Sequence, residues 1–195
     1  MPERTFGGTA GNEALTSAAA AVLTVLLLAE GVTILNVRQL RTPHMFVGMV
    51  LIPPVLVKLG SSGYRFARYY LGARAYREKG PPLLGLRLLA PLLIVATVGV
   101  FGTGVALLAV GHRTGSLLEV HKVCFIVWGV VFAVHFLAHL PAVIRSLRSD
   151  WTTARRREVP GSGPRLGLLV SSVAVGIAVA LVLLSTMNGW HGERF

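Results

Sequence analysis

The stretch HKVCFIVWGVVFAVHFLAH, residues 121–139, carries three histidines through an otherwise largely apolar run of membrane-helix length. On an α-helix, the 14-residue spacing places His121 and His135 within about 40° of each other and about 21 Å apart along the axis. His139 returns to the azimuth of His121 at about 27 Å. Ionisable side chains are costly inside a bilayer and indicate function there. The segment therefore predicts a membrane helix that presents imidazoles on one face at two depths.

The composition of the whole chain also indicates a membrane protein. Its 195 residues are 53% hydrophobic and only 14% charged, whereas a soluble domain is about a quarter charged. The abundance of leucine and valine and the absence of a repeat exclude collagen and disordered classes. The single cysteine, Cys124, excludes a disulfide framework and a cysteine-based zinc site. We expect an all-α polytopic membrane protein.

Five apolar stretches reach or approach the roughly 20 residues that a membrane-spanning helix needs. They cover about residues 15–37, 44–60, 88–110, 117–144 and 166–187. Pro53 and Pro54 predict a kink in the second, and the aromatic and basic segment Tyr64–Tyr76 is expected to form a separate interfacial helix.

The spans divide the chain into five parts. These are a cytoplasmic N-terminus (1–14), a four-helix membrane bundle (15–144), a basic cytoplasmic connector (145–165), a fifth transmembrane helix (166–187) and an outer tail (188–195). Because the fifth helix carries almost no polar residues, we expect it to be peripheral and the functional site to lie in the first four.

The basic residues predict the orientation. Of 19 lysines and arginines, 14 fall at the N-terminus, at Lys58 and in the segments that follow the second and fourth spans. Because loops rich in these residues stay in the cytoplasm, the N-terminus is predicted inside the plasma membrane and the C-terminus outside. Orientation and contact with anionic lipids explain the net charge of +11 without a nucleic-acid partner.

His44 is expected to lie at the same depth as His121. Each opens or nearly opens its helix, and both helices are predicted to begin on the outer side. In a four-helix bundle, such a pair can approach a planar ligand from opposite faces, which is the geometry of a bis-histidine haem. We therefore expect His44 and His121 to be axial ligands of haem iron. The spacing to His135 would let the fourth helix serve a second haem.

With these histidines, the chain resembles the bacterial membrane b-type cytochromes. This group includes superoxide oxidase and the cytochrome b subunits of membrane hydrogenases and formate dehydrogenases. The resemblance covers about residues 15–144 and rests on His44 and the motif His121-Lys122-x12-His135-x3-His139. The sequence is also similar to a group of actinobacterial membrane proteins through Arg41-Thr-Pro-His44 and residues 58–70.

The resemblance implies non-covalent haem b, a quinone or quinol, and electron transfer to or from a redox partner subunit or an oxygen species. A two-haem member needs four ligands, but the first helix here has no histidine. Lys58 stands 14 residues after His44, where a partner for His135 would be expected. A neutral lysine could ligate iron, whereas a lysine at a helix end more often snorkels or pairs with a haem propionate. One haem or two thus remains open.

Three other polar residues are candidates for supporting roles. Arg41 and Lys122 lie at the predicted outer rim, where they would either hold propionates or be solvated. Glu30 lies within the first span and would either relay protons during quinol oxidation or make a helix–helix hydrogen bond.

Two other classes of function compete with a cytochrome. A metal-ion binding or transport protein would use His135, His139 and Glu30, because an i, i+4 histidine pair can chelate zinc or copper. A non-catalytic membrane assembly subunit is the other. The sequence has no nucleotide-binding or catalytic-triad motif, so whether the chain is an oxidoreductase or only an electron carrier stays open.

Overall fold

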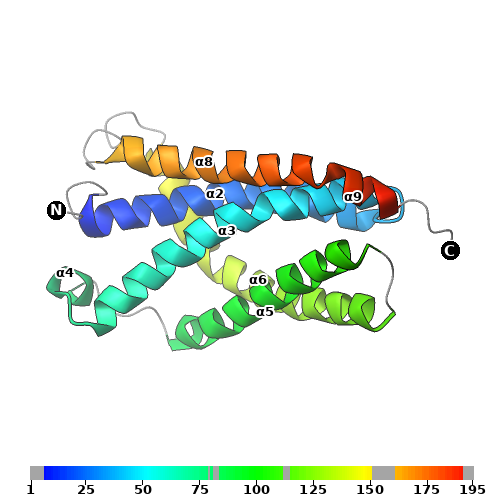
Figure 1. Ribbon diagram of the computed structural model, residues 1–195. Coiled ribbons are helices and arrows are strands. Elements are labelled where there is room, and N and C mark those ends of the chain that lie inside the picture. The colour runs from blue at the N-terminus through cyan, green and yellow to red at the C-terminus, as the bar shows by residue number, and fades with distance from the viewer. Residues whose placement is uncertain (1–6, 79, 81–83, 112–114, 151–160, 191–195) are drawn as a thin grey trace.

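The computed structural model describes residues 7–78, 80, 84–111, 115–150 and 161–190, without the side chains of residues 84, 86, 87 and 139–150. Over these residues it is helical and has no strand, which confirms the predicted all-α fold. The helices are α2 (Gly8–Leu35), α3 (Arg41–Tyr70), α4 (Arg74–Arg77), α5 (Leu84–Val110), α6 (Gly115–Asp150), α8 (Ser162–Val182) and α9 (Leu184–Gly189) (Figure 1).

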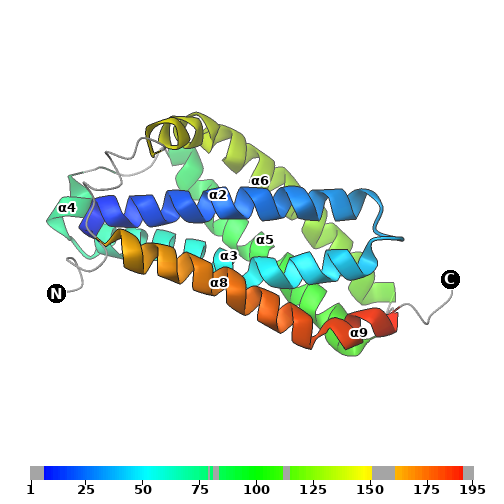
Figure 2. The same cartoon turned by 90° about the horizontal axis from the view of Figure 1, so that it is seen from above.

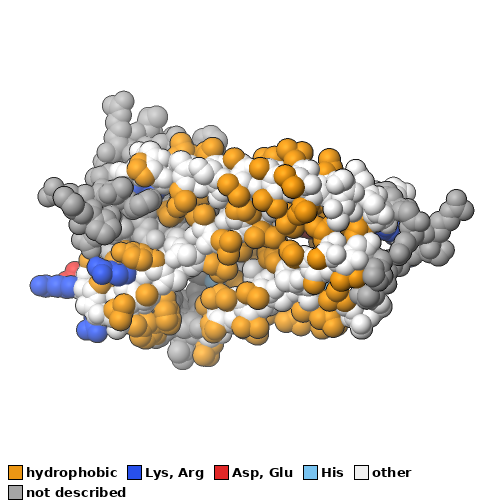
Figure 3. All heavy atoms as spheres, viewed as in Figure 1, with side chains coloured by type: hydrophobic (Ala, Val, Ile, Leu, Met, Phe, Trp, Pro, Cys, Tyr) orange, Lys and Arg blue, Asp and Glu red, His pale blue; other side chains and the backbone are white. Residues whose placement is uncertain are grey.

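Five helices are long and apolar enough to cross a membrane, as predicted. They are Gly8–Leu35, Arg41–Tyr70, Leu88–Val110, Gly115–Ala138 and Ser162–Val182. Hydrophobic side chains spread over the middle of the molecule, whereas lysine and arginine gather mainly at the end that holds α4 (Figure 3). The start of α2 and the end of α9 lie at opposite ends, as an odd number of spans requires (Figure 1).

The second span is longer than the sequence predicted. α3 continues through Pro53 and Pro54 as far as Tyr70, so the separate interfacial helix expected at Tyr64–Tyr76 is wrong. A membrane helix tolerates proline because neighbouring helices and local adjustment satisfy the freed backbone groups. The chain instead turns after α3 at Gly72, whose positive φ of 88° a side chain would strain.

The five long helices form two groups. α2 and α8 both pack along α3, while α5 and α6 pair with each other as an antiparallel hairpin. Figure 1 shows α2, α3 and α8 side by side, with the α5–α6 hairpin below them. Figure 2 shows α6 crossing obliquely beside α2. Contacts between the groups are much fewer and are mainly those of α3 with α5.

α8 is a full member of the first group and not the peripheral helix that its composition predicted. A Cβ on Gly176 would lie 2.7 Å from the backbone oxygen of Val50, so only glycine allows the two backbones to approach this closely. Further along, Leu169 of α8 packs with Leu15 and Ala19 of α2. A span with few polar residues can therefore still pack extensively against a neighbouring helix.

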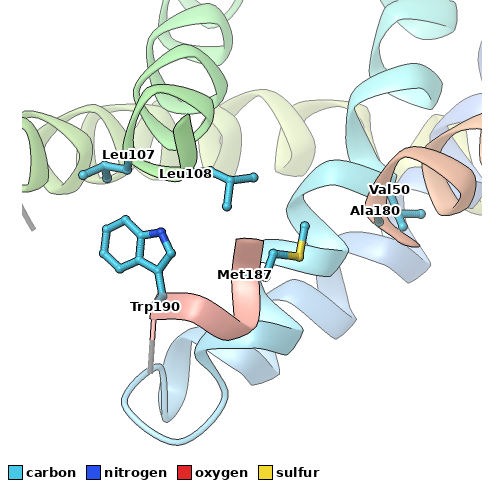
Figure 4. Close-up of a cluster of buried hydrophobic side chains, with 6 residues drawn as sticks. All are labelled: Val50, Leu107, Leu108, Ala180, Met187 and Trp190. Atoms are coloured by element: carbon cyan, nitrogen blue, oxygen red, sulfur yellow. The ribbon is translucent and has the colours of Figure 1, made fainter. Parts of the chain in front are cut away.

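The two groups are joined by a hydrophobic cluster at the end where α3 begins, which we call the His44 end. Its buried members are Val50, Leu107, Leu108, Ala180, Met187 and Trp190 (Figure 4). Leu117 and Leu118 at the start of α6 pack against it. The cluster therefore holds α3, the end of α5, the start of α6 and the C-terminal α9 in one layer.

We predict that Gly176→Ala destabilises the protein. The added methyl group would force α8 away from α3, and overpacking of this kind costs about 1–3 kcal/mol. Thermal unfolding in detergent should show a lower midpoint for Gly176→Ala. Gly167→Ala is the matched control on the same helix, because a Cβ there meets nothing within 4 Å. Equal midpoints for both variants would contradict the close α3–α8 contact.

Candidate functional site

The structure brings together the two histidines that the sequence placed at one depth. His44 lies in the first turn of α3, and His121 lies in the second turn of α6. Their ring centroids are 6.5 Å apart and the rings are inclined by 70°. The pair joins a side chain of α3 to a side chain of α6 and so links the two helix groups.

Glu30 of α2 fixes the orientation of His44. Its Oε1 lies 2.8 Å from His44 Nδ1, and the glutamate is buried with 9% of its surface exposed. Thr33 lies beside this contact: its hydroxyl donates to the Glu30 carbonyl oxygen at 2.6 Å, and the same hydroxyl oxygen is 3.2 Å from Oε2. Since a carboxylate accepts a hydrogen bond, Nδ1 of His44 carries a proton, and in the neutral imidazole Nε2 is then the nitrogen with the lone pair. The helix–helix hydrogen bond considered for Glu30 is present.

Thr103 of α5 hydrogen-bonds Nδ1 of His121, as Glu30 does for His44. The threonine hydroxyl donates to the Gly99 carbonyl at 2.7 Å, so its oxygen is left to accept from His121 Nδ1 at 2.9 Å. Gly104 makes room for the ring, because a Cβ there would lie 3.3 Å from His121 Cε1. Nε2 of His121 is therefore also the nitrogen that carries the lone pair.

The two imidazoles are thus prepared as a pair of ligands. Metal-bound histidines generally donate their other ring N–H to a carboxylate, hydroxyl or carbonyl, which fixes the tautomer. With metal–nitrogen bonds of about 2 Å and a ring centroid about 1 Å beyond each nitrogen, two axial imidazoles have centroids roughly 6 Å apart. The observed 6.5 Å matches this spacing. His44 and His121 therefore fit the axial positions of a haem iron.

The glycines near the site serve the contact between α5 and α6. A Cβ on Gly99 would lie 3.2 Å from Cys124 Sγ, and Gly104 faces the His121 ring. Gly48 of α3 lies beside Glu30, where a Cβ would meet Oε1 at an ordinary 3.8 Å. Small residues that let helices approach are common in membranes, and at Gly99 and Gly104 the neighbour is α6.

The two cations for which propionate binding and solvation were both considered each have a protein partner. Arg41 donates from Nη1 to the Trp190 carbonyl at 2.9 Å and so anchors the end of α9 to the start of α3. Lys122 is exposed and donates to Glu119 Oε1 at 2.7 Å on the same helix.

Lys58 belongs to a different polar cluster, which lies between α2 and α3 towards the opposite end. Its Nζ donates to the Thr16 carbonyl at 3.0 Å. One turn on, Ser61 hydrogen-bonds the Thr16 hydroxyl, and Asn12 donates to the Ser61 carbonyl at 3.1 Å. This cluster accounts for a lysine in the span as a tie between two helices, so the structure lends no support to Lys58 as an iron ligand.

The structure describes the second set of histidines only in part. His135 lies half-buried on α6, and the side chain of His139 lies outside the described residues. Between the levels of His121 and His135, the rings of Phe125, Trp128 and Phe132 are stacked along α6. Within the described part of the chain, no group of three or more histidine, cysteine or acidic residues could hold a metal ion. The predicted second haem and the transport site thus gain no support.

Three residues that the sequence did not single out shape the site: Thr33, Thr103 and Trp190. Thr33 could have been found, because it lies one helical turn after Glu30. The pairing of Thr103 with His121 depends on the register of the α5–α6 hairpin, and the contact of Trp190 with Arg41 joins residues 149 apart. Only tertiary structure shows these two.

Comparisons with protein-family models, curated proteins and solved structures found no match to this chain. The geometry of the histidine pair therefore carries the functional argument.

We predict that Lys58→Met lowers stability and leaves haem binding unchanged. Loss of the ammonium removes its hydrogen bond to α2, worth about 1–2 kcal/mol, so the thermal midpoint in detergent should fall. Lys122→Met, at an exposed site on α6, is the control with little expected effect on stability. A drop in the haem-to-protein ratio of Lys58→Met, without loss of folded protein, would instead indicate that Lys58 ligates iron.

Proposed function

We propose that this protein is a membrane b-type cytochrome that carries electrons between the quinone pool and a redox partner or an oxygen species. The observation that carries the proposal is the facing pair His44 and His121, each with Nδ1 engaged by a neighbouring helix. Haem b, when bound, supplies an iron that changes its charge by one electron.

The chain contributes the ligands and their environment. His44 and His121 would hold the iron from opposite faces, one from each helix group. Glu30 and Thr103 keep the two rings in the tautomer that leaves Nε2 available. The surrounding apolar helices exclude water and anchor the site in the bilayer. Glu30 is then a positioning residue for His44.

The predicted partners and orientation follow from this role. A quinol releases two electrons and two protons, so a carrier with one haem passes the electrons singly to a partner on the protein surface. The basic end with α4 would face the cytoplasm of the plasma membrane, and the His44 end would face outward. Whether the chain acts alone as an oxidoreductase or as an electron-transfer subunit is decided by quinol-dependent reduction of the purified protein.

Optical spectra test the haem directly. Protein purified from cells supplied with haem should show a Soret band and, after dithionite reduction, an α band at one haem per chain. His44→Ala and His121→Ala should each abolish these bands, because each removes an axial ligand. His135→Ala is the matched control on the same helix and should keep them. Wild-type protein without absorbance would overturn the proposed function.

Substitution of Glu30 tests the positioning role through the reduction potential. The carboxylate on His44 Nδ1 favours the more positive ferric iron, so Glu30→Gln should raise the midpoint potential. Replacement of a charge-assisted by a neutral hydrogen bond, about 1 kcal/mol, corresponds to roughly 40 mV for one electron. Redox titration followed at the α band measures the shift.

Glu13→Gln provides the control for this titration. Glu13 lies at the other end of α2, 3.9 Å from Arg65, and its loss should leave the potential unchanged. An unchanged or lower potential in Glu30→Gln, with the Soret band intact, would contradict the positioning role. Glu30→Asp, which keeps the charge, should restore a potential close to that of the wild type.

A further inference from the structure

The indole N–H of Trp190 is a buried hydrogen-bond donor for which the described residues offer no acceptor. Trp190 follows α9, is 8% exposed, and its Nε1 has no hydrogen-bond partner among the described residues. A buried polar group left unpaired destabilises a folded protein, and such groups are rare. An indole N–H can only donate, so the position requires an acceptor.

Several contacts hold this ring in place. Arg41 donates to the Trp190 carbonyl, and the Thr42 hydroxyl donates to Asn188 Oδ1 at 3.3 Å. The start of α3 therefore contacts the end of the chain around α9 at two points. Met187, one turn before, has no exposed surface. Figure 4 shows the Trp190 ring facing Leu107 and Leu108, with its nitrogen turned toward α5 and away from the end of the chain. The N–H is therefore fixed toward the interior.

The cluster that contains Trp190 lies next to the histidine pair. Leu107 follows Thr103 by one turn of α5, and Leu117 precedes His121 by one turn of α6. On α3, Arg41 precedes His44 by three residues. In each of these three pairs, the residue near Trp190 lies about 5 Å along the helix axis from the residue at the histidine site, in the direction of the His44 end.

We propose that Trp190 is a ligand-binding residue whose indole N–H donates to a propionate carboxylate of the haem held between His44 and His121. This inference rests on the proposed function. A propionate is acceptor-only and anionic, which suits a donor-only group, and the rim residues Arg41 and Lys122 are engaged by protein partners. The C-terminal α9 would then bound the site at the His44 end, where Trp190 would hold the propionate.

Haem titration of the apoprotein in detergent tests this role. Trp190→Phe keeps an aromatic ring in the cluster but removes the donor, and a hydrogen bond to a charged acceptor is worth roughly ten-fold or more in affinity. Trp190→Phe should therefore bind haem at least about ten-fold more weakly. Trp128→Phe is the matched control, because the Trp128 N–H already donates to Thr97 at 3.1 Å, and its haem affinity should stay near that of the wild type.

The dimethyl ester of haem separates the hydrogen bond from packing. Esterification removes the anionic acceptor, so wild type and Trp190→Phe should bind the ester with similar affinity. An equal loss of affinity for haem and for its ester in Trp190→Phe would mean that the ring only packs, and would overturn the inference. Equal haem affinity in wild type and Trp190→Phe would also overturn it, whereas absence of haem binding to the wild type would overturn the proposed function itself.

A second readout uses the unaltered site and does not depend on the folding of a variant. In protein labelled with 15N-tryptophan, the indole signal of Trp190 is the one missing from Trp190→Phe. This signal should move downfield when diamagnetic gallium protoporphyrin IX binds, and less with its dimethyl ester. The same shift with both compounds, or none with either, would contradict a bond to the propionate.

Discussion

A buried carboxylate in an apolar membrane helix must find a hydrogen-bond donor, and the rest of the site depends on how Glu30 does so. Its partner is His44, at 2.8 Å on the next helix. This contact pins the start of α3 to α2 and fixes which nitrogen of His44 stays available. Because the ring cannot turn without leaving Glu30 unpaired, the remaining Nε2 is held for a ligand between the helix groups.

The α5–α6 hairpin brings the second ligand by a different device. The Thr103 hydroxyl donates to the Gly99 carbonyl and accepts a hydrogen bond from His121 Nδ1. The absence of a side chain at Gly104 leaves room for the His121 ring. The hairpin meets the other helices mainly through the cluster around Leu107 and Trp190. The packing at the His44 end therefore holds the two histidines near each other, and Met187 of α9 takes part in that packing.

The basic end works differently. There, hydrogen bonds join α2 and α3 through the side chains or backbone of Lys58, Thr16, Ser61 and Asn12. These polar groups therefore hold the two helices together. The contrast explains why two ionisable residues of one helix, His44 and Lys58, have separate roles. His44 uses only Nδ1 in its contact with Glu30, whereas Lys58 donates to the backbone carbonyl of Thr16.

The sequence by itself determined the all-α class, the five spans and the shared depth of His44 and His121, because the bilayer imposes length and hydropathy on every crossing helix. It could not predict that α3 runs on to Tyr70, that Gly176 lets α8 pack against Val50, or that Arg41 and Lys58 have protein partners. These features depend on which helix faces touch and in which register. Apolar membrane helices carry little sequence signal for that choice, so only the tertiary structure decided that Glu30 meets His44, Thr103 meets His121, and Arg41 meets Trp190.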